Sequence, residues 1–332
     1  MRTRGVLHHT LRKGLMPTTV LQTEQLTKRY GDLTAVDALT LDVHEGEILG
    51  FLGPNGAGKT TSISMMCGLL QPDAGRVLIH GQPVHGGTPK VRARVGVCPQ
   101  ETILWEKLTG LEQLEFIGSL YGLSPRTARQ RGAVLLETLG LSAKADHLAG
   151  KFSGGMKRRL NLALALVHDP EILVLDEPEA GLDPQSRVLV REYVRSLARK
   201  KTVILTTHNM DEADRLADRV AIVDHGRLLV VDTPEALKRT VGEGDVLEVD
   251  LADAAPRSAA HPVAASALAA RFFADVSTID HTLTVRGRGL IERLPELLQA
   301  LRAAGVQPTD VRLRANTLED VFLALTGRRL RE

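Results

Sequence analysis

The feature that most constrains the fold is a glycine-rich loop between an apolar run and a predicted helix. The loop has the spacing G-x-x-x-x-G-K-[ST] and consists of Gly53, Pro54, Asn55, Gly56, Ala57, Gly58, Lys59, Thr60 and Thr61. Its glycines allow several backbone N–H groups to face one anion, and the following helix directs its positive dipole end there. Lys59 offers a mobile charge to terminal phosphates, and Thr60 offers a hydroxyl to Mg²⁺. We therefore predict a nucleotide phosphate site, and the alternative is a plain glycine turn between a strand and a helix.

Length and composition indicate a globular protein of one or two domains. The chain has 332 residues, of which 43% are hydrophobic and 25% charged, enough to bury a full core. A formal net charge of +2 argues against a surface built for nucleic acid, and no uncharged apolar run has the length of a membrane span. Cys67 and Cys98 stand in apolar surroundings without metal-site spacing, so we expect two buried thiols.

Two acids end an aliphatic run over residues 172–177. Such a run is typical of a strand that is buried on both faces. Asp176 stands at the usual position of an acid that holds Mg²⁺, directly or through water, and Glu177 next to it is placed to polarise a water molecule. The alternative is a pair of solvated acids at a strand end, which the apolar run before them and Pro178 after them disfavour.

A second glycine loop, with Ser153, Gly154 and Gly155, precedes a predicted helix shortly before this acidic strand. A hydroxyl and backbone N–H groups at a helix start can bind an anion. The alternative is a simple N-cap, with Ser153 as the capping residue and the glycines in the turn. In isolation the loop favours the N-cap, but its place before the acidic strand favours a role at the same site.

Together these motifs resemble the ATP-binding subunit of an ABC transporter over about residues 20–240. The matching motifs, in chain order, are Walker A at 53–61, a Q-loop glutamine at Gln100, the family signature at 153–157, Walker B at 172–177, a D-loop at 180–183 and an H-loop histidine at His208. Two departures from the family pattern are Glu179, where Thr is common, and Phe152, where Tyr is common. Glu179 is expected to add a negative charge near the site.

The resemblance implies a role for each matching residue, with ATP and Mg²⁺ as the cofactors. The implied catalytic residues are Glu177, His208 and Lys59. The implied Mg²⁺ ligands are Thr60, Gln100 and Asp176. The implied nucleotide contacts are the Walker A residues 53–61, Tyr30 by stacking on adenine, Gln100, Ser153, Gly154, Gly155 and Asp183.

The expected fold class is α/β. The resemblance implies a P-loop NTPase of ABC type, with a mixed sheet core, a β-subdomain and an inserted helical subdomain at about residues 105–168. Alternating strand and helix patterns independently predict a mainly parallel sheet. Beyond residue 242 the predicted order β-α-β-β-α-β indicates a small α+β domain of ferredoxin-like type, closed by one more helix. We expect a disordered leader at 1–16, the ATP-binding domain at 17–241 and an accessory domain at 242–332.

The resemblance also implies partners. In this family two ATPase domains pair head to tail, and each ATP lies between Walker A of one and the signature loop of the other. We therefore expect a homodimer, or a pair with a related ATPase subunit, bound to a separate integral membrane permease at the cytoplasmic face of the cell membrane. The permease is expected to dock near residues 100–122, with Leu104 and Trp105 as candidate contacts, unless these two belong to the core of the helical insert.

The single ATPase domain and the C-terminal extension, with the run 317–322, resemble the drug-export, daunorubicin-resistance-type branch of the family. This narrower resemblance implies export of a drug, a lipid or another small molecule. One alternative is a soluble ABC ATPase that acts on nucleic acid or the ribosome, but the single ATPase domain and balanced charge disfavour it, and no nucleic acid is expected. Another is a nucleotide-gated scaffold whose tail is the effector.

Overall fold

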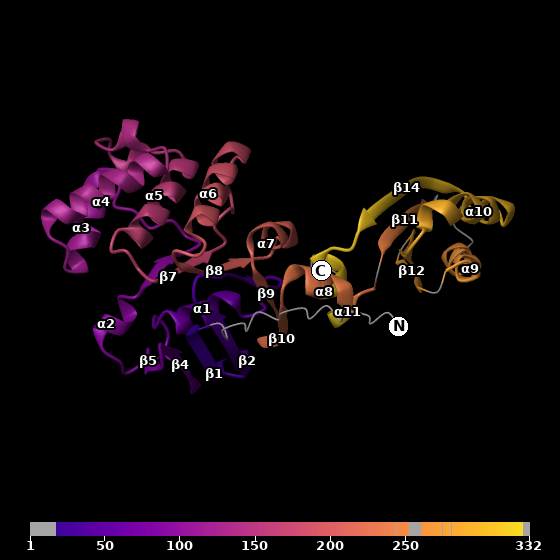
Figure 1. Ribbon diagram of the computed structural model, residues 1–332, viewed down its shortest axis with the longest axis horizontal. Helices are drawn as coiled ribbons and strands as arrows, with labels where there is room; N and C mark the ends of the chain where they lie inside the picture. Colours follow the sequence, from indigo (N-terminus) through magenta and orange to yellow (C-terminus); the bar gives the residue numbers. More distant parts are fainter. Residues whose placement is uncertain (1–17, 243, 252–259, 274, 280, 328–332) are drawn as a thin grey trace, which may run out of the picture.

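A computed structural model describes residues 18–242, 244–251, 260–273, 275–279 and 281–327 (Figure 1). The leader predicted over residues 1–16 lies outside these residues. At the centre is a six-stranded sheet of order β10-β9-β3-β8-β7-β6, in which only β10 runs antiparallel to its neighbour. Its strands are β3 (Ile48–Leu52), β6 (Val95–Cys98), β7 (Ile172–Asp176), β8 (Thr202–Thr207), β9 (Arg219–Asp224) and β10 (Arg227–Asp232). The predicted, mainly parallel sheet is thus confirmed.

A second, antiparallel sheet has the order β2-β1-β4-β5. It consists of β1 (Thr19–Tyr30), β2 (Leu33–His44), β4 (Ala74–Ile79) and β5 (Gln82–Pro83). β1 stays paired with β2 up to the Tyr30–Leu33 pair. The turn is confined to Gly31 and Asp32, so Tyr30 stands at the end of a strand.

Helices cover the faces of the central sheet. In Figure 1, α3 (Gly110–Leu120), α4 (Pro125–Thr138), α5 (Gly154–Leu166) and α6 (Pro184–Leu197) lie on the side of β7 and β8 opposite to β1 and β2. Short helices complete this part of the chain: α1 (Lys59–Met66), α2 (Pro89–Arg92), the 3₁₀ turns η1 (Ser142–Lys144) and η2 (Ala149–Lys151), and α7 (Met210–Leu216). Thr109 begins α3 with a capping box to Glu112, and Ser124 caps α4. Of these helices, α3, α4 and α5 lie between β6 and β7 in the chain, and α6 follows β7.

The described residues between 245 and 315 include a third sheet of order β12-β13-β11-β14, antiparallel throughout. Its elements follow the order β11 (Asp245–Leu251), α9 (Ala260–Ala269), β12 (Asp275–Ile279), β13 (Thr282–Gly287), α10 (Leu290–Ala303) and β14 (Pro308–Ala315). Leu247 and Val249 of β11 pack with Leu297 and Leu301 of α10 in a core of their own. The opposite sides of the strands carry charged and hydroxyl side chains.

The last helix of this C-terminal part lies against the N-terminal part of the chain. The sequence analysis missed α8 (Pro234–Thr240), although Thr233 caps it and Pro234 occupies its first turn. The closing helix α11 (Leu318–Thr326) packs against α7 and α8. Phe322 of α11 shares one buried cluster with Met210 of α7 and Leu237 of α8. The chain therefore leaves the core after α8 and returns to it with α11.

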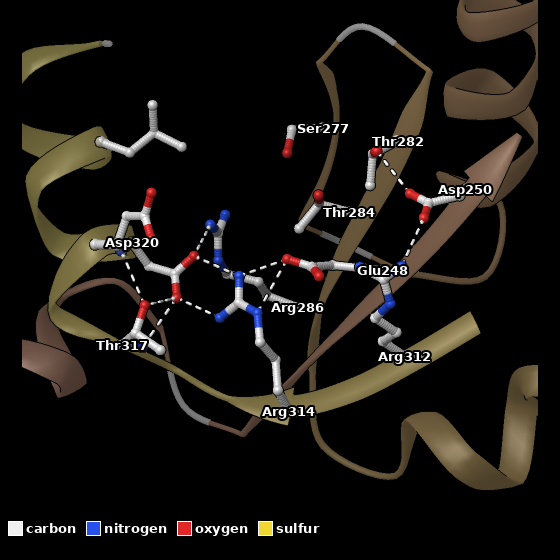
Figure 2. Close-up of a pocket in the computed structure, with 12 residues that line it drawn as sticks. Glu248, Asp250, Ser277, Thr282, Thr284, Arg286, Arg312, Arg314, Thr317 and Asp320 are labelled. Carbon is white, nitrogen blue, oxygen red and sulfur yellow. Dashed lines mark hydrogen bonds and ion pairs between the residues drawn. The ribbon is translucent and has the colours of Figure 1, made fainter. Parts of the chain in front are cut away.

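Arg314 at the end of β14 joins the accessory sheet to this returning helix (Figure 2). Its guanidinium donates to Glu248 of β11 at 2.6 Å and to Asp320 of α11 at 2.6 Å. Burial by itself would raise the pKa of Asp320, but hydrogen bonds from Arg314 and Thr317 outweigh it and lower the pKa to about 2. The ion pairs line a polar pocket of about 360 Å³ between the sheet and α11.

We predict that Arg314→Met weakens the attachment of α11. The variant leaves the buried Asp320 carboxylate without its main partner, which costs about 1–3 kcal/mol. Hydrogen exchange followed by mass spectrometry should show faster exchange in α11, while the accessory core around Leu247 stays protected. The control is Arg312→Met on the same strand, because its 63% exposed side chain should contribute less than about 0.5 kcal/mol. Equal exchange in the two variants would contradict this role of Arg314.

Candidate functional site

The loop between β3 and α1 has a backbone that only glycine permits at two positions. A Cβ on Gly53 would lie 2.3 Å from the carbonyl oxygen of Val223. Gly58 has φ +93°, and a Cβ there would lie 2.3 Å from the carbonyl oxygen of Ala35. The strand on one side and the β-subdomain on the other thus press against the loop and force it into a concave shape at the start of α1.

Lys59 is curled over this loop. Its side chain is 7% exposed, and Nζ donates to the carbonyl oxygens of Gly53 at 2.7 Å and Pro54 at 3.0 Å. Burial lowers the pKa of Lys59, while the charges of Glu177 and Asp176 act in the opposite direction. Those two carboxylates come from the end of β7. The lysine of the loop and the acids at the strand end therefore interact electrostatically.

Asp176 is held by hydroxyl groups from both sides. Thr60 of α1 donates to Oδ2 at 3.3 Å, and Thr206 of β8 donates to Oδ1 at 2.5 Å. Thr206 Oγ1 also accepts a bond of 3.0 Å from the backbone N–H of Glu177. The sequence analysis missed Thr206, although a hydroxyl residue near the carboxyl end of a buried aliphatic strand was a signal for it.

Glu177 lies directly beyond β7 in a left-handed backbone conformation, with φ +50°. Such a conformation is uncommon for a residue with a long side chain and is often found at functional sites. Its Oε1 lies 2.9 Å from Nδ1 of His208 and 4.0 Å from Nζ of Lys59. The side chain of Glu177 is thus fixed between the H-loop histidine and the phosphate-loop lysine.

These groups line one cleft of about 590 Å³. Its walls include Tyr30, Asn55, Gly56, Gly58, Lys59, Thr60, Thr61, Gln100, Asp176, Glu177 and His208, all of which the sequence analysis selected. Leu33, Thr34, Ala35, His225 and Gly226 also line it and were not anticipated. Gly53, Pro54 and Ala57 do not line the cleft. They support the loop from behind, two of them through the carbonyls that accept from Lys59.

The second glycine loop and the D-loop aspartate do not line this cleft. Ser153 caps α5 by accepting from the N–H of Met156, and Asp183 caps α6 by accepting from the N–H of Ser186. That hydrogen bond lowers the pKa of the Asp183 carboxyl. A Cβ on Gly155 would lie 3.2 Å from an Asp183 oxygen, so these two loops lie side by side. Gly154 stands in open space between Ser153 and Gly155.

The donor set of the cleft fits a nucleotide phosphate and Mg²⁺. The concave glycine loop, the start of α1 and the Lys59 ammonium suit an anion, and a Cβ at Gly53 or Gly58 would fill the cradle. The oxygens of Thr60, Asp176 and Gln100 suit a hard cation that keeps several waters. Tyr30, with 51% exposure at the rim, offers an aromatic face.

Glu179 does not add a free charge to the cleft, contrary to the expectation from the sequence. Its carboxylate is 7% exposed and makes a bidentate pair with Arg191 of α6, at 2.8 and 2.6 Å. Nε of Arg187 on the same helix lies 3.8 Å from Oε2 of Glu179. The Arg187 side chain also donates to the D-loop carbonyl of Leu182. The charge of Glu179 is therefore neutralised beneath the D-loop.

A buried acid lies close behind the H-loop. Glu212 of α7 is 4% exposed and accepts a 2.6 Å hydrogen bond from Thr207 on one oxygen, while the other has no partner. Burial raises the pKa of Glu212 to about 7, and the charges of Glu179 and Glu177 add to the rise against the effect of Thr207. The folded protein thus holds a proton on Glu212 that the unfolded chain releases near pH 4.5.

We predict that Glu212 makes stability fall as pH rises from about 5 to 7. Because the folded state binds the extra proton in this window, the loss amounts to about 3 kcal/mol at pH 8. Glu212→Gln should remove this slope, so that urea midpoints match wild type near pH 5 and exceed it at pH 8. Glu192→Gln, an exposed change on α6, serves as the control. A variant that keeps the wild-type slope would show that Glu212 is charged in the folded state.

Comparisons with known proteins agree with this geometry. Residues 36–180 match the family model described as ABC transporter. The chain is 42% identical over 320 residues to the daunorubicin resistance ATP-binding protein DrrA3 of Streptomyces coeruleorubidus, covering 96% of this chain and 99% of that protein. It is also 42% identical over 320 residues to the Nod factor export ATP-binding protein I of Burkholderia lata, covering 96% of this chain and all of that protein.

A solved structure described as an ATP-binding subunit of an ABC transporter superposes with a TM-score of 0.62 and 30% identity. The match covers 67% of this chain and 93% of that one. The part matched has the size of the two N-terminal sheets with their helices. The chain therefore belongs to the family of ATP-binding subunits of ABC transporters.

Proposed function

We propose that this chain hydrolyses ATP to drive export of a drug, a lipid or another small molecule through a separate membrane permease. The observation that carries the proposal is Glu177, held against His208 and Lys59 in a cleft that also contains the phosphate loop. The named relatives serve daunorubicin resistance and Nod factor export, which supports the export direction. No observation favours a nucleic-acid partner, and we propose none.

In this proposal each side chain of the cleft has one task. Lys59 and the backbone N–H groups of 56–60 hold the β- and γ-phosphates, with Tyr30 against the adenine ring. Thr60, Gln100 and Asp176 hold Mg²⁺, which neutralises charge that develops on the phosphates. Glu177 orients and polarises the attacking water, and His208 contacts the γ-phosphate.

We further propose that the complete site forms between two copies of this chain. The signature residues Ser153, Gly154 and Gly155 and the adjacent Asp183 lie outside the cleft of their own chain. Their N–H groups at the start of α5 are suited to an anion that a second chain presents. A head-to-tail homodimer supplies this pairing twice, because each chain carries one phosphate loop and one signature loop.

The permease is proposed to bind the outer face of the helical insert. Trp105 and Phe116 form an edge-to-face pair there, each more than 40% exposed, with Ile103 and Leu120 more exposed still. Leu104 instead packs against the buried core, so of the two expected contacts only Trp105 is available at the surface. Within the described residues, no helix has the length and hydropathy that crossing a membrane requires.

A peripheral position at the cytoplasmic face of the cell membrane follows from this docking proposal. We propose residues 17–241 as the ATP-binding domain, with the helical subdomain at about 105–168, and 242–332 as the accessory domain. The docking of α11 on α7 and α8 supports a role for the accessory domain in bracing the ATPase core.

The prediction for this proposal concerns Glu177→Gln. Without the carboxylate that polarises water, turnover should fall by about 100-fold or more, while ATP binding persists and a dimer accumulates. Size-exclusion chromatography with ATP and Mg²⁺ measures the dimer, and phosphate release measures turnover. Lys59→Ala is the control, because it removes the phosphate anchor and should show neither tight ATP binding nor a dimer. Unchanged turnover in Glu177→Gln would contradict the proposed function.

A further inference from the structure

One arginine of the signature helix contacts two catalytic loops of its own chain. Arg158 lies in α5, five residues after Ser153, and its side chain is 5% exposed. Its guanidinium donates to the main-chain carbonyls of Pro99, Gln100, Asp176, Glu177 and Pro178. The distances to Gln100, Asp176 and Glu177 are 2.9, 2.6 and 2.8 Å.

This arrangement uses the whole hydrogen-bonding capacity of the side chain. A guanidinium has five N–H donors in a fixed plane, and the five bonds to carbonyls match that number. All five acceptors are main-chain carbonyls and none is a carboxylate. An apolar side chain in this place would leave these carbonyls without donors, at about 1–3 kcal/mol for each buried group. The arginine therefore fixes the backbone of these residues as well as filling space.

The carbonyls belong to two separate loops with functional side chains. Pro99 and Gln100 follow β6, and the Gln100 side chain lines the nucleotide cleft. Asp176 ends β7, and Glu177 follows it. Asn161, one turn further along α5 and 5% exposed, also donates to the carbonyl of Pro99, at 3.3 Å. The same face of the helix thus holds both loops.

We propose that Arg158 is a positioning residue that couples the two nucleotide sites of the dimer. This inference rests on the proposed function, in which Ser153 at the start of α5 serves the partner's nucleotide. Gln100 and Glu177 serve the nucleotide of their own chain. Because Arg158 joins α5 to both loops, a movement of the signature helix on closure is transmitted to the water-polarising carboxylate and the Mg²⁺ site.

The test compares Arg158→Lys with wild type in the full chain. Lysine keeps the charge but has only three donors on a point-like head, so it cannot make all five bonds to the two loops. We expect wild type to hydrolyse ATP with a Hill coefficient above 1. In the variant the coefficient should fall to about 1 and kcat should fall about tenfold. Binding of a fluorescent ATP analogue to the monomer should change by less than about twofold, because Arg158 does not line the cleft.

Arg131→Lys is the matched control. Arg131 also lies in the helical insert and donates to one carbonyl at the other end of α5, that of Val167. It should keep the wild-type Hill coefficient and kcat. Asn161→Ala removes one bond to the same loop and should shift both quantities in the same direction as Arg158→Lys, by less. This second variant decides the matter if Arg158→Lys does not fold, which thermal unfolding monitored by circular dichroism would reveal.

Several outcomes would overturn the inference. They are a folded Arg158→Lys with wild-type kinetics, a loss of kcat with the Hill coefficient unchanged, and a wild-type Hill coefficient of 1. If Arg158→Lys does not fold, wild-type kinetics in Asn161→Ala would overturn the inference. A wild-type chain that neither hydrolyses ATP nor dimerises would instead contradict the proposed function, so the two failures are distinguishable.

Discussion

The structure of the site depends on the end of one buried strand. Four fully buried apolar residues, 172–175, lead to Asp176 at the end of β7 and to Glu177 after it, which are 5% and 6% exposed. Thr206 on the neighbouring β8 bonds both the Asp176 carboxylate and the Glu177 backbone. The register of two parallel strands therefore sets where the Asp176 and Glu177 carboxylates stand relative to the phosphate loop.

From this strand end, hydrogen bonds extend in two directions. Towards the cleft, Glu177 meets His208 and Lys59. Away from the cleft, its carbonyl accepts from Arg158 of the signature helix, whose first residues face outward from their own cleft. The same few residues thus belong to the chain's own nucleotide site and to a surface suited to a second copy. In the proposed dimer, this double use would let one chain supply both halves of a site.

Much of the fold and of the cleft could be predicted from the sequence, because the decisive signals are local. The glycine spacing, the aliphatic run before Asp176 and the strand–helix alternation each lie within a few residues. What the sequence left out depends on contacts between distant residues. The length of β1 up to Tyr30 is set by pairing with β2, and the docking of α11 is set by Phe322 on α7 and α8. Glu179 was misjudged because its partner Arg191 lies twelve residues away on the next helix.

The central claim is that each working site combines the phosphate loop of one chain with the signature loop of another. Two inactive variants test it most directly: Lys59→Ala, which lacks the phosphate anchor, and Ser153→Arg, which blocks the signature loop. Each alone should release no phosphate above background. A mixture should regain turnover, because a mixed dimer contains one site with an intact half from each chain. If the mixture stays as inactive as its components while wild type turns over, the sites are not shared between chains and the account is wrong.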